Sequence, residues 1–162
     1  RKRGDGAVVL GCGFAVVSRC CNKGTGSRTP RGVGAACHGM ESQVLGHDDP
    51  IYKNIESYQQ HGSVYGVIPA KRVKFGELGT WNVEEIRAVG DRITVTVNGE
   101  VILDGNIRKA CKGHNVAPDG STKNPYTVDG RNHPGLFNKK GHIGLLGHGP
   151  GIRFRNIRVK EL

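Results

Sequence analysis

The sequence predicts an all-β protein, an antiparallel sandwich or barrel with long loops and little helix. Several stretches alternate apolar and polar residues, which is the pattern of half-buried strands. Glycine, with 26 of 162 residues, weakens helices and suits turns and bulges. Helical periodicity is nearly absent, and short strands joined by turns pack as two sheets or close into a barrel. The length fits a single domain, residues 1–162.

The first readable strand is predicted near residue 40. Residues 24–34 have the composition of a loop. Residues 39–50, "GMESQVLGHDDP", begin as a strand that carries Glu41 and Gln43 on the same side, because side chains two residues apart share a face. Residues 51–60 are polar and are expected to contain a helical turn.

A second strand is predicted for residues 61–71, "HGSVYGVIPAK". Alternation directs one set of side chains to the core and the other to solvent. The solvent side carries an imidazole, a hydroxyl and a phenol beside glycines, which is unusual for a strand face that contacts only water. The apolar side has Val64, Ile68 and Ala70, and the opposite side has His61, Ser63, Tyr65 and Lys71.

The clearest local pattern is a hairpin within residues 91–105. Asn98-Gly99 is the preferred pair for a two-residue type I′ turn, so strands are predicted at 92–97 and 100–104. Apolar residues alternate along both arms, with Ile93, Val95 and Val97 before the turn and Val101 and Leu103 after it.

Three further segments complete the predicted order. Residues 79–90 form a strand with Trp81 and Val83 on one side. Residues 106–140 are rich in Gly, Asn, Pro and Lys and form a connection longer than packing requires. Residues 141–162 hold two last strands, and the final one is expected to need a partner from early in the chain.

Composition limits the partners. The net charge of +10 permits polyanion binding, but the basic residues are scattered and not interleaved with aromatics, which disfavours nucleic acid. No apolar run reaches the roughly 18 residues of a membrane span, and no signal peptide is recognised. The five cysteines have irregular spacing that matches no zinc ribbon. No cofactor is predicted, and a divalent metal stays open.

Five stretches occur in a recognisable order: "CHGMESQVL" (37–45), "YQQHGSVYGVIPAK" (58–71), "GTWNVEEI" (79–86), "ITVTVNGEVILDGN" (93–106) and "GHIGLLGHGPGIRFRNIRVKEL" (141–162). Together they resemble the bacterial 3-keto-disaccharide hydrolase family over about residues 22–162. Each stretch alone is weak, whereas five in register are specific. Residues 1–21 do not match the family's first strands, so these strands are expected to be divergent or incomplete.

The resemblance implies a concanavalin-like jelly roll, a two-sheet sandwich with a carbohydrate site on its concave sheet. It also implies a secreted protein, periplasmic or extracellular, that cleaves glycosides whose sugar carries a ketone at carbon 3. The ketone acidifies the hydrogen on carbon 2, so a base can form an enolate, the substituent at carbon 1 leaves, and water adds. Such a site needs a base, a donor to the enolate oxygen and an acid for the leaving group.

The candidate catalytic residues are Glu41, His61 and Lys71. Either Glu41 or His61 would be the base, and Lys71 or Tyr65 would lie near the ketone oxygen. Because Gln43 stands where a second acid could accompany Glu41, two-carboxylate glycosidase chemistry is disfavoured. The candidate substrate-binding residues are Gln43, Tyr65, Trp81, His133 and His148, and a shared pocket is predicted for Glu41, Gln43, His61, Tyr65 and His148.

Two other functions stay open. A noncatalytic carbohydrate-binding module would use the same sandwich, since a fold does not fix a function. A surface that binds polyanions would show steep salt dependence. Self-association through an uncovered edge strand is a further expectation.

Overall fold

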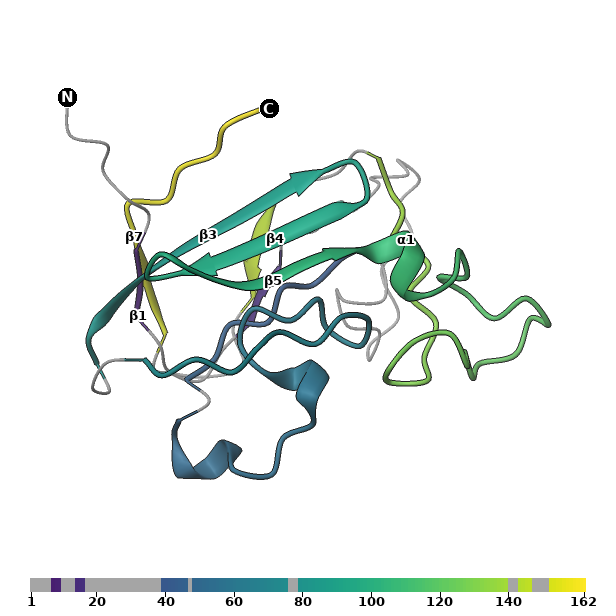
Figure 1. Ribbon diagram of the computed structural model, residues 1–162, viewed down its shortest axis with the longest axis horizontal. Helices are drawn as coiled ribbons and strands as arrows, with labels where there is room; N and C mark the ends of the chain where they lie inside the picture. The colour runs from purple at the N-terminus through teal and green to yellow at the C-terminus, as the bar shows by residue number, and fades with distance from the viewer. Residues whose placement is uncertain are drawn as a thin grey trace, which may run out of the picture.

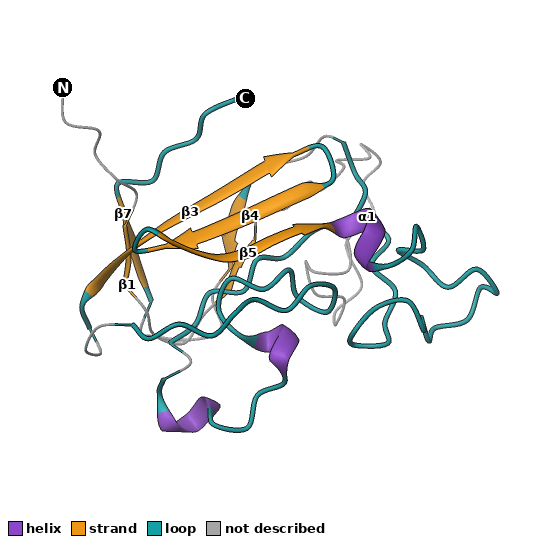
Figure 2. Cartoon of the chain, viewed as in Figure 1, coloured by secondary structure: helices purple, strands orange, loops and turns teal. Residues whose placement is uncertain are grey.

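In the part of the chain described by the computed structural model, the regular secondary structure is mostly strand with little helix, and long loops join the strands (Figures 1 and 2). Its helices are two 3-10 turns, η2 (Pro50–Tyr52) and η3 (Ser57–Gln59), and the short α1 (Ile107–Ala110). None of these described helices has the length and apolar character needed to cross a bilayer. The described residues are 7–9, 14–16, 39–46, 48–75, 79–139, 143–146 and 152–162.

Five strands pair side by side in the order β5-β4-β3-β1-β7. Their bounds are Ala7–Val9 (β1), Trp81–Val89 (β3), Arg92–Val97 (β4), Glu100–Asn106 (β5) and Arg153–Arg155 (β7). All neighbours are antiparallel, and β1 lies between β3 and β7. The expectation that the final strand needs a partner from early in the chain is therefore confirmed.

A separate antiparallel pair joins β2 (Phe14–Val16) to β6 (Gly144–Leu146). Residues 141–162 thus contain the two predicted strands, β6 and β7, although each has only three residues. Residues 7–16 supply β1 and β2, so strands are present in the segment that did not match the expected family pattern. The two-sheet jelly roll stays a prediction, because the described residues form one sheet and one separate strand pair.

The predicted hairpin is confirmed. The turn residues Asn98 and Gly99 have φ values of 50° and 86°, and a type I′ turn requires positive φ at both. The Asn98 side chain also ties the turn to β3, because its Oδ1 accepts from the Val83 backbone N–H at 2.9 Å. Its Nδ2 donates to Asn82 Oδ1 at 2.7 Å. Local turn chemistry and the neighbouring strand therefore favour the same register.

Gly99→Ala should destabilise the protein by about 1 kcal/mol, because alanine is strained at positive φ. No other group lies within 4 Å of the position that a Cβ would take, so the effect should come from the backbone alone. Gly144 likewise has no group within 4 Å of the position of a Cβ, but its φ is not positive. Gly144→Ala is therefore the matched control. Chemical unfolding of the two variants should separate them by that amount.

The core lies on one face of the β3–β4–β5 sheet. The inward residues Ile93, Val95 and Val97 of β4 are at most 2% exposed, and each such burial contributes about 1.5–3 kcal/mol. Residues 40–73 cover this face and contribute Met40, Val64, Val67, Ala70 and Val73 to the same cluster. In Figure 1 this segment runs along one side of the three strands. Loops and turns therefore form the layer that packs on the sheet.

The strand predicted for residues 61–71 is wrong. The segment contains only isolated bridges, Ser42 to Val64 and Val64 to Ile68, and it turns where Gly62 and Gly66 adopt φ of 78° and 72°. Positive φ interrupts an extended strand, so the alternation of side chains does not produce two flat faces.

The alternation expected in β5, with Val101 and Leu103 on the same side, is interrupted by a β-bulge. Val95 pairs with Leu103 and Thr96 pairs with Val101, which leaves Ile102 as the extra residue. Ile102 and Leu103 are consequently both buried, whereas Val101 is exposed. The side chain of Ile102 fills the space beside Gly62, where a Cβ would collide with it.

Candidate active site

The strand predicted at the start of residues 39–50 is wrong, because the described part of this stretch has only one isolated bridge, at Ser42. Residues 39–46 nevertheless place Glu41 and Gln43 inside the protein. The Gln43 backbone N–H donates to the Ser63 carbonyl at 3.0 Å, and the Tyr65 N–H donates to the Glu41 carbonyl at 3.0 Å. Glu41 and Gln43 are 9% and 4% exposed. Among the described residues, nothing donates a hydrogen bond to Oε1 of either side chain. Two buried oxygens on this segment are thus available to a ligand.

A buried Asp–His pair lies close to Glu41. His133, 6% exposed, places Nε2 at 3.1 and 3.2 Å from the two carboxylate oxygens of Asp129. Burial opposes ionisation of Asp129, but the hydrogen bonds from His133 and the Arg131 N–H outweigh it and hold the pKa of Asp129 below its ordinary value. An ionised carboxylate accepts, so Nε2 of His133 carries the proton. Asp129 therefore fixes the orientation of this histidine and keeps a proton on Nε2.

The carboxyl of Glu41 titrates near neutral pH. Burial raises its pKa from 4.5 to about 7, and the nearby charge of His133 partly opposes that rise. A carboxylate with this pKa is half ionised at neutral pH and is well matched to removing a proton. The site thus combines a base that is partly ionised at neutral pH, Glu41, with a histidine whose ring is held in place, His133.

Gly66 makes room for this group. Its carbonyl accepts from the N–H groups of Val128 and Asp129 at 2.9 and 3.2 Å, which brings the 124–133 loop against the 61–68 turn. A Cβ at Gly66 would lie 2.6 Å from Cγ of Asp129 and 2.8 Å from Cε1 of His133. The close approach of backbone to the Asp–His pair therefore depends on glycine.

Two tyrosines lie next to these residues. Tyr58 and Tyr65 meet edge to face with ring centroids 5.5 Å apart, and Gln59 Nε2 donates to the Tyr65 hydroxyl at 3.2 Å. Burial raises the pKa of Tyr58, with further contributions from Tyr65 and Asp129. Half-buried phenols beside a buried acid can both stack on a sugar ring and hydrogen-bond its hydroxyls.

His61 does not face solvent, as the alternation predicted, but is 1% exposed. Its Nδ1 accepts from the Leu45 N–H at 3.3 Å, and its ring meets Phe75 edge to face at 4.9 Å. Its Nε2 lies 3.6 Å from Oε1 of Glu84 on β3, whose side chain is 6% exposed. Because Nδ1 accepts, the ring is neutral with its proton on Nε2. His61 thus links the 61–68 turn to the sheet.

Glu84→Gln should raise the free energy of unfolding at neutral pH by about 3 kcal/mol. Burial raises the pKa of Glu84 from 4.5 to about 8, so the folded protein keeps a proton that the unfolded chain has released. Wild-type stability should therefore fall as pH rises from 4.5 to about 8, and the glutamine variant should lose this slope. Glu85→Gln, at the adjacent exposed position, is the control. An unchanged slope in Glu84→Gln would contradict the assignment.

Lys71 and Trp81 lie outside this group of residues. Lys71 is exposed, and its backbone N–H donates to the bulge residue Ile102 at 2.8 Å. Trp81 shares a side of β3 with Val83 as predicted, but that side is the exposed one, and Arg155 covers the indole at 3.9 Å. His148 lies outside the described residues. Of the eight candidates, the structure thus brings Glu41, Gln43, Tyr65 and His133 into one neighbourhood.

The sequence interpretation missed Asp129 and Glu84. Asp129 precedes His133 by four residues in "DGRNHPG", where two glycines indicate a tight turn that could bring the side chains together. Glu84 sits in "NVEEI", and only strand parity against the apolar Ile86 marks it as the inward glutamate of the pair. The only cysteine among the described residues, Cys111, is a buried free thiol that donates to the Ile107 carbonyl. No group of three or more potential metal ligands occurs within the described ranges.

The described residues thus bring together a buried acid of near-neutral pKa, an Asp–His pair and adjacent tyrosines, a set of groups able to move protons on a bound ligand. Residues 10–160 match the profile of the 3-keto-alpha-glucoside-1,2-lyase-like domain, and the chain belongs to this family. The expected family resemblance is thereby confirmed.

One relative and two solved structures are similar to this chain. The chain is 29% identical over 126 residues to a 3-keto-disaccharide hydrolase of Bacteroides thetaiotaomicron, covering 75% of this chain and 43% of the relative. It therefore spans less than half the length of that protein. It also shares the fold of two crystal structures described as candidate glycosyl hydrolases from Parabacteroides distasonis. One has a TM-score of 0.66 at 24% identity and covers 98% of this chain and 76% of the other. The second has a TM-score of 0.60 at 16% identity, with coverage of 94% and 66%.

Proposed function

We propose that the protein is a sugar-acting enzyme that cleaves glycosides whose sugar carries a ketone at carbon 3. The observation that carries the proposal is the buried Glu41, whose pKa lies near 7 beside the Asp129–His133 pair. The name of the family and that of the Bacteroides relative support the same substrate class. The two-layer jelly roll implied by the sequence resemblance is part of this proposal.

Glu41, rather than His61, is the proposed base. The Nδ1 lone pair of His61 already accepts a hydrogen bond from Leu45, and its Nε2 faces Glu84. Glu41 has a buried oxygen with no hydrogen-bond donor among the described residues, and its pKa suits proton removal near neutral pH. The carboxylate would take the proton from carbon 2, and the electron pair would move to the ketone oxygen as an enolate.

His133 and Tyr65 have proposed roles in the following steps. Tyr65 would donate a hydrogen bond to the enolate oxygen, a contribution of about 10²–10³-fold for a well-placed donor. His133, oriented by Asp129 through Nε2–H, would act as the imidazolium and give its Nδ1 proton to the oxygen that leaves carbon 1. The neutral Nδ1 would then take a proton from the water that adds to carbon 1, which restores the imidazolium, and Glu41 returns its proton to carbon 2. Gln43 would bind a sugar hydroxyl through its buried amide.

The test compares a 3-keto disaccharide with the parent disaccharide that lacks the ketone. Incubation with the purified protein, followed by chromatography of the free sugars, should show release from the keto compound alone. Release from both substrates at equal rates would identify an ordinary glycosidase and contradict the elimination. Saturable binding of the keto compound without any release would support a noncatalytic carbohydrate-binding module instead.

A further inference from the structure

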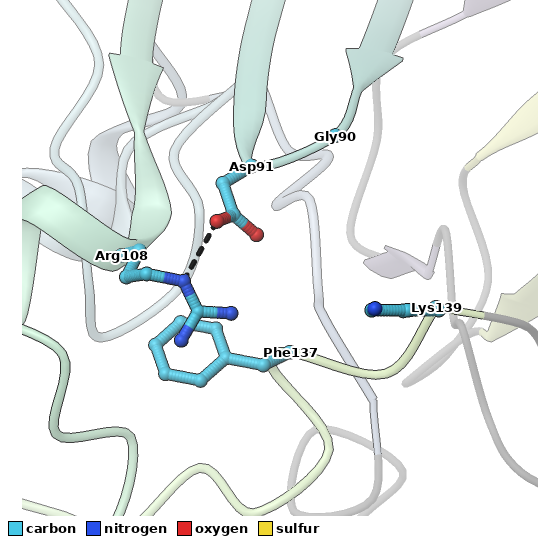
Figure 3. Close-up of a pocket in the computed structure, with 5 residues that line it drawn as sticks. All are labelled: Gly90, Asp91, Arg108, Phe137 and Lys139. Atoms are coloured by element: carbon cyan, nitrogen blue, oxygen red, sulfur yellow. Dashed lines mark hydrogen bonds and ion pairs between the residues drawn. The ribbon is translucent and has the colours of Figure 1, made fainter.

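A pocket lies at the end of the sheet where β3 turns into β4, away from the candidate active site. It has a volume of about 540 Å³, within the range of about 300–1,000 Å³ for small-molecule sites. Three parts of the chain meet there: the β3–β4 turn, the start of α1 and the segment after His133. The lining residues are Gly90, Asp91, Arg108, Phe137 and Lys139 (Figure 3). None of them belongs to the candidate active site.

Arg108 is held in one orientation by two contacts. Its Nε lies 2.7 Å from Oδ2 of Asp91, and its guanidinium carbon lies 4.0 Å from the centre of the Phe137 ring. The Asp91 carbonyl also accepts from the Ile107 N–H at 2.9 Å, which fixes the carboxylate relative to α1. Phe137 in turn packs against the main hydrophobic core. The guanidinium is therefore preorganised, with little rotamer freedom left to lose on binding a ligand.

The charge of this pocket is not balanced. Arg108 and Lys139 contribute two cations, whereas Asp91 contributes one carboxylate that already pairs with Nε of Arg108. Figure 3 shows the Lys139 ammonium directed toward the space beside Phe137 and Arg108. Within the part of the chain that the structure describes, Lys139 and the terminal nitrogens of Arg108 have no carboxylate partner.

We propose that this pocket binds the oxyanion group of a small acidic molecule, such as a carboxylate, sulfate or phosphate. The two terminal nitrogens of a planar, immobilised guanidinium match a pair of oxygens on such a group, and a lysine adds a point charge beside them. The pocket volume leaves room for a sugar-sized body attached to the anion. The inference concerns binding and is independent of the proposed catalysis.

Calorimetric titrations with glucuronate, inorganic phosphate and sulfate test the proposal, with neutral glucose for comparison. Chloride keeps the ionic strength constant, so general screening does not mimic a site. At least one oxyanion should bind saturably, and Arg108→Gln should weaken it roughly tenfold or more. Lys139→Gln, at an exposed position, should weaken the same ligand severalfold and preserve the fold.

Arg92→Gln is the matched control. Arg92 is another exposed arginine paired with an aspartate, Asp104, at 2.6 Å, but it does not line the pocket. Binding lost in both pocket variants and retained in the control supports the site, and the preferred probe identifies the type of oxyanion. No saturable binding, or equal weakening in all three variants, would overturn the proposal.

Discussion

Glu41→Gln should lower turnover on a 3-keto disaccharide by about 10²–10⁴-fold, the usual contribution of a general base, with little change in substrate affinity. Glutamine keeps the shape of the side chain and cannot accept the proton from carbon 2. Turnover should therefore fall far more than substrate affinity, because the lost interaction forms only in the transition state.

The pH dependence provides a second readout of the same assignment. With a pKa of about 7, Glu41 is protonated and inactive as a base on the acid side and ionised on the alkaline side. The kcat/KM of the wild-type protein should therefore rise with pH through about 7 and level off above it. Residual activity of Glu41→Gln should lack this rise. Glu100→Gln, at an exposed position on β5, should retain both the rate and the profile of the wild type.

His61 offers the sharpest contrast with Glu41. Its replacement by alanine removes the acceptor for the Leu45 N–H and leaves Glu84 buried without its imidazole. The expected result is a loss of roughly 2–4 kcal/mol in the free energy of unfolding. The fraction of the variant that remains folded should keep the pH profile of the wild type. If the rise of kcat/KM with pH disappeared in His61→Ala and persisted in Glu41→Gln, His61 rather than Glu41 would be the base.

The hairpin was predictable because its information is local. Asn98-Gly99 dictates the turn through backbone conformation alone, and the apolar alternation of β4 needs no knowledge of its partners. The 61–71 segment misled the interpretation because alternation does not register positive φ at Gly62 and Gly66. At both glycines a residue distant in sequence also lies where a Cβ would stand, Ile102 at Gly62 and Asp129 at Gly66. Such contacts join residues that are far apart in the sequence.

The candidate site was only partly predictable for the same reason. Parity along a short stretch singled out Glu41 and Gln43, but it could not reveal that the fold buries both side chains. Burial is what brings the pKa of Glu41 to about 7, and it depends on the whole fold. His133 could be singled out as a histidine in a loop, whereas its partnership with Asp129 required the conformation of that loop.

Gly66→Ala should destabilise the protein by about 2–4 kcal/mol and also disturb the candidate site. Part of this loss, about 1 kcal/mol, reflects alanine at a φ of 72°. The rest comes from the added methyl group, which would lie 2.6 Å from Cγ of Asp129 and 2.8 Å from Cε1 of His133. Neither side chain can move far without breaking the hydrogen bond between them, because both are buried.

Gly120→Ala separates the two contributions. Gly120 has a φ of 75°, close to that of Gly66, but no other group lies within 4 Å of the position of a Cβ. Denaturant unfolding should therefore show a loss of about 1 kcal/mol for Gly120→Ala and a clearly larger one for Gly66→Ala. In Gly66→Ala alone, the rise of kcat/KM should also move to higher pH. Displacing His133 removes a charge that lowers the pKa of Glu41. Equal losses of stability in both variants, together with an unshifted pH profile, would show that Gly66 does not support the Asp129–His133 pair.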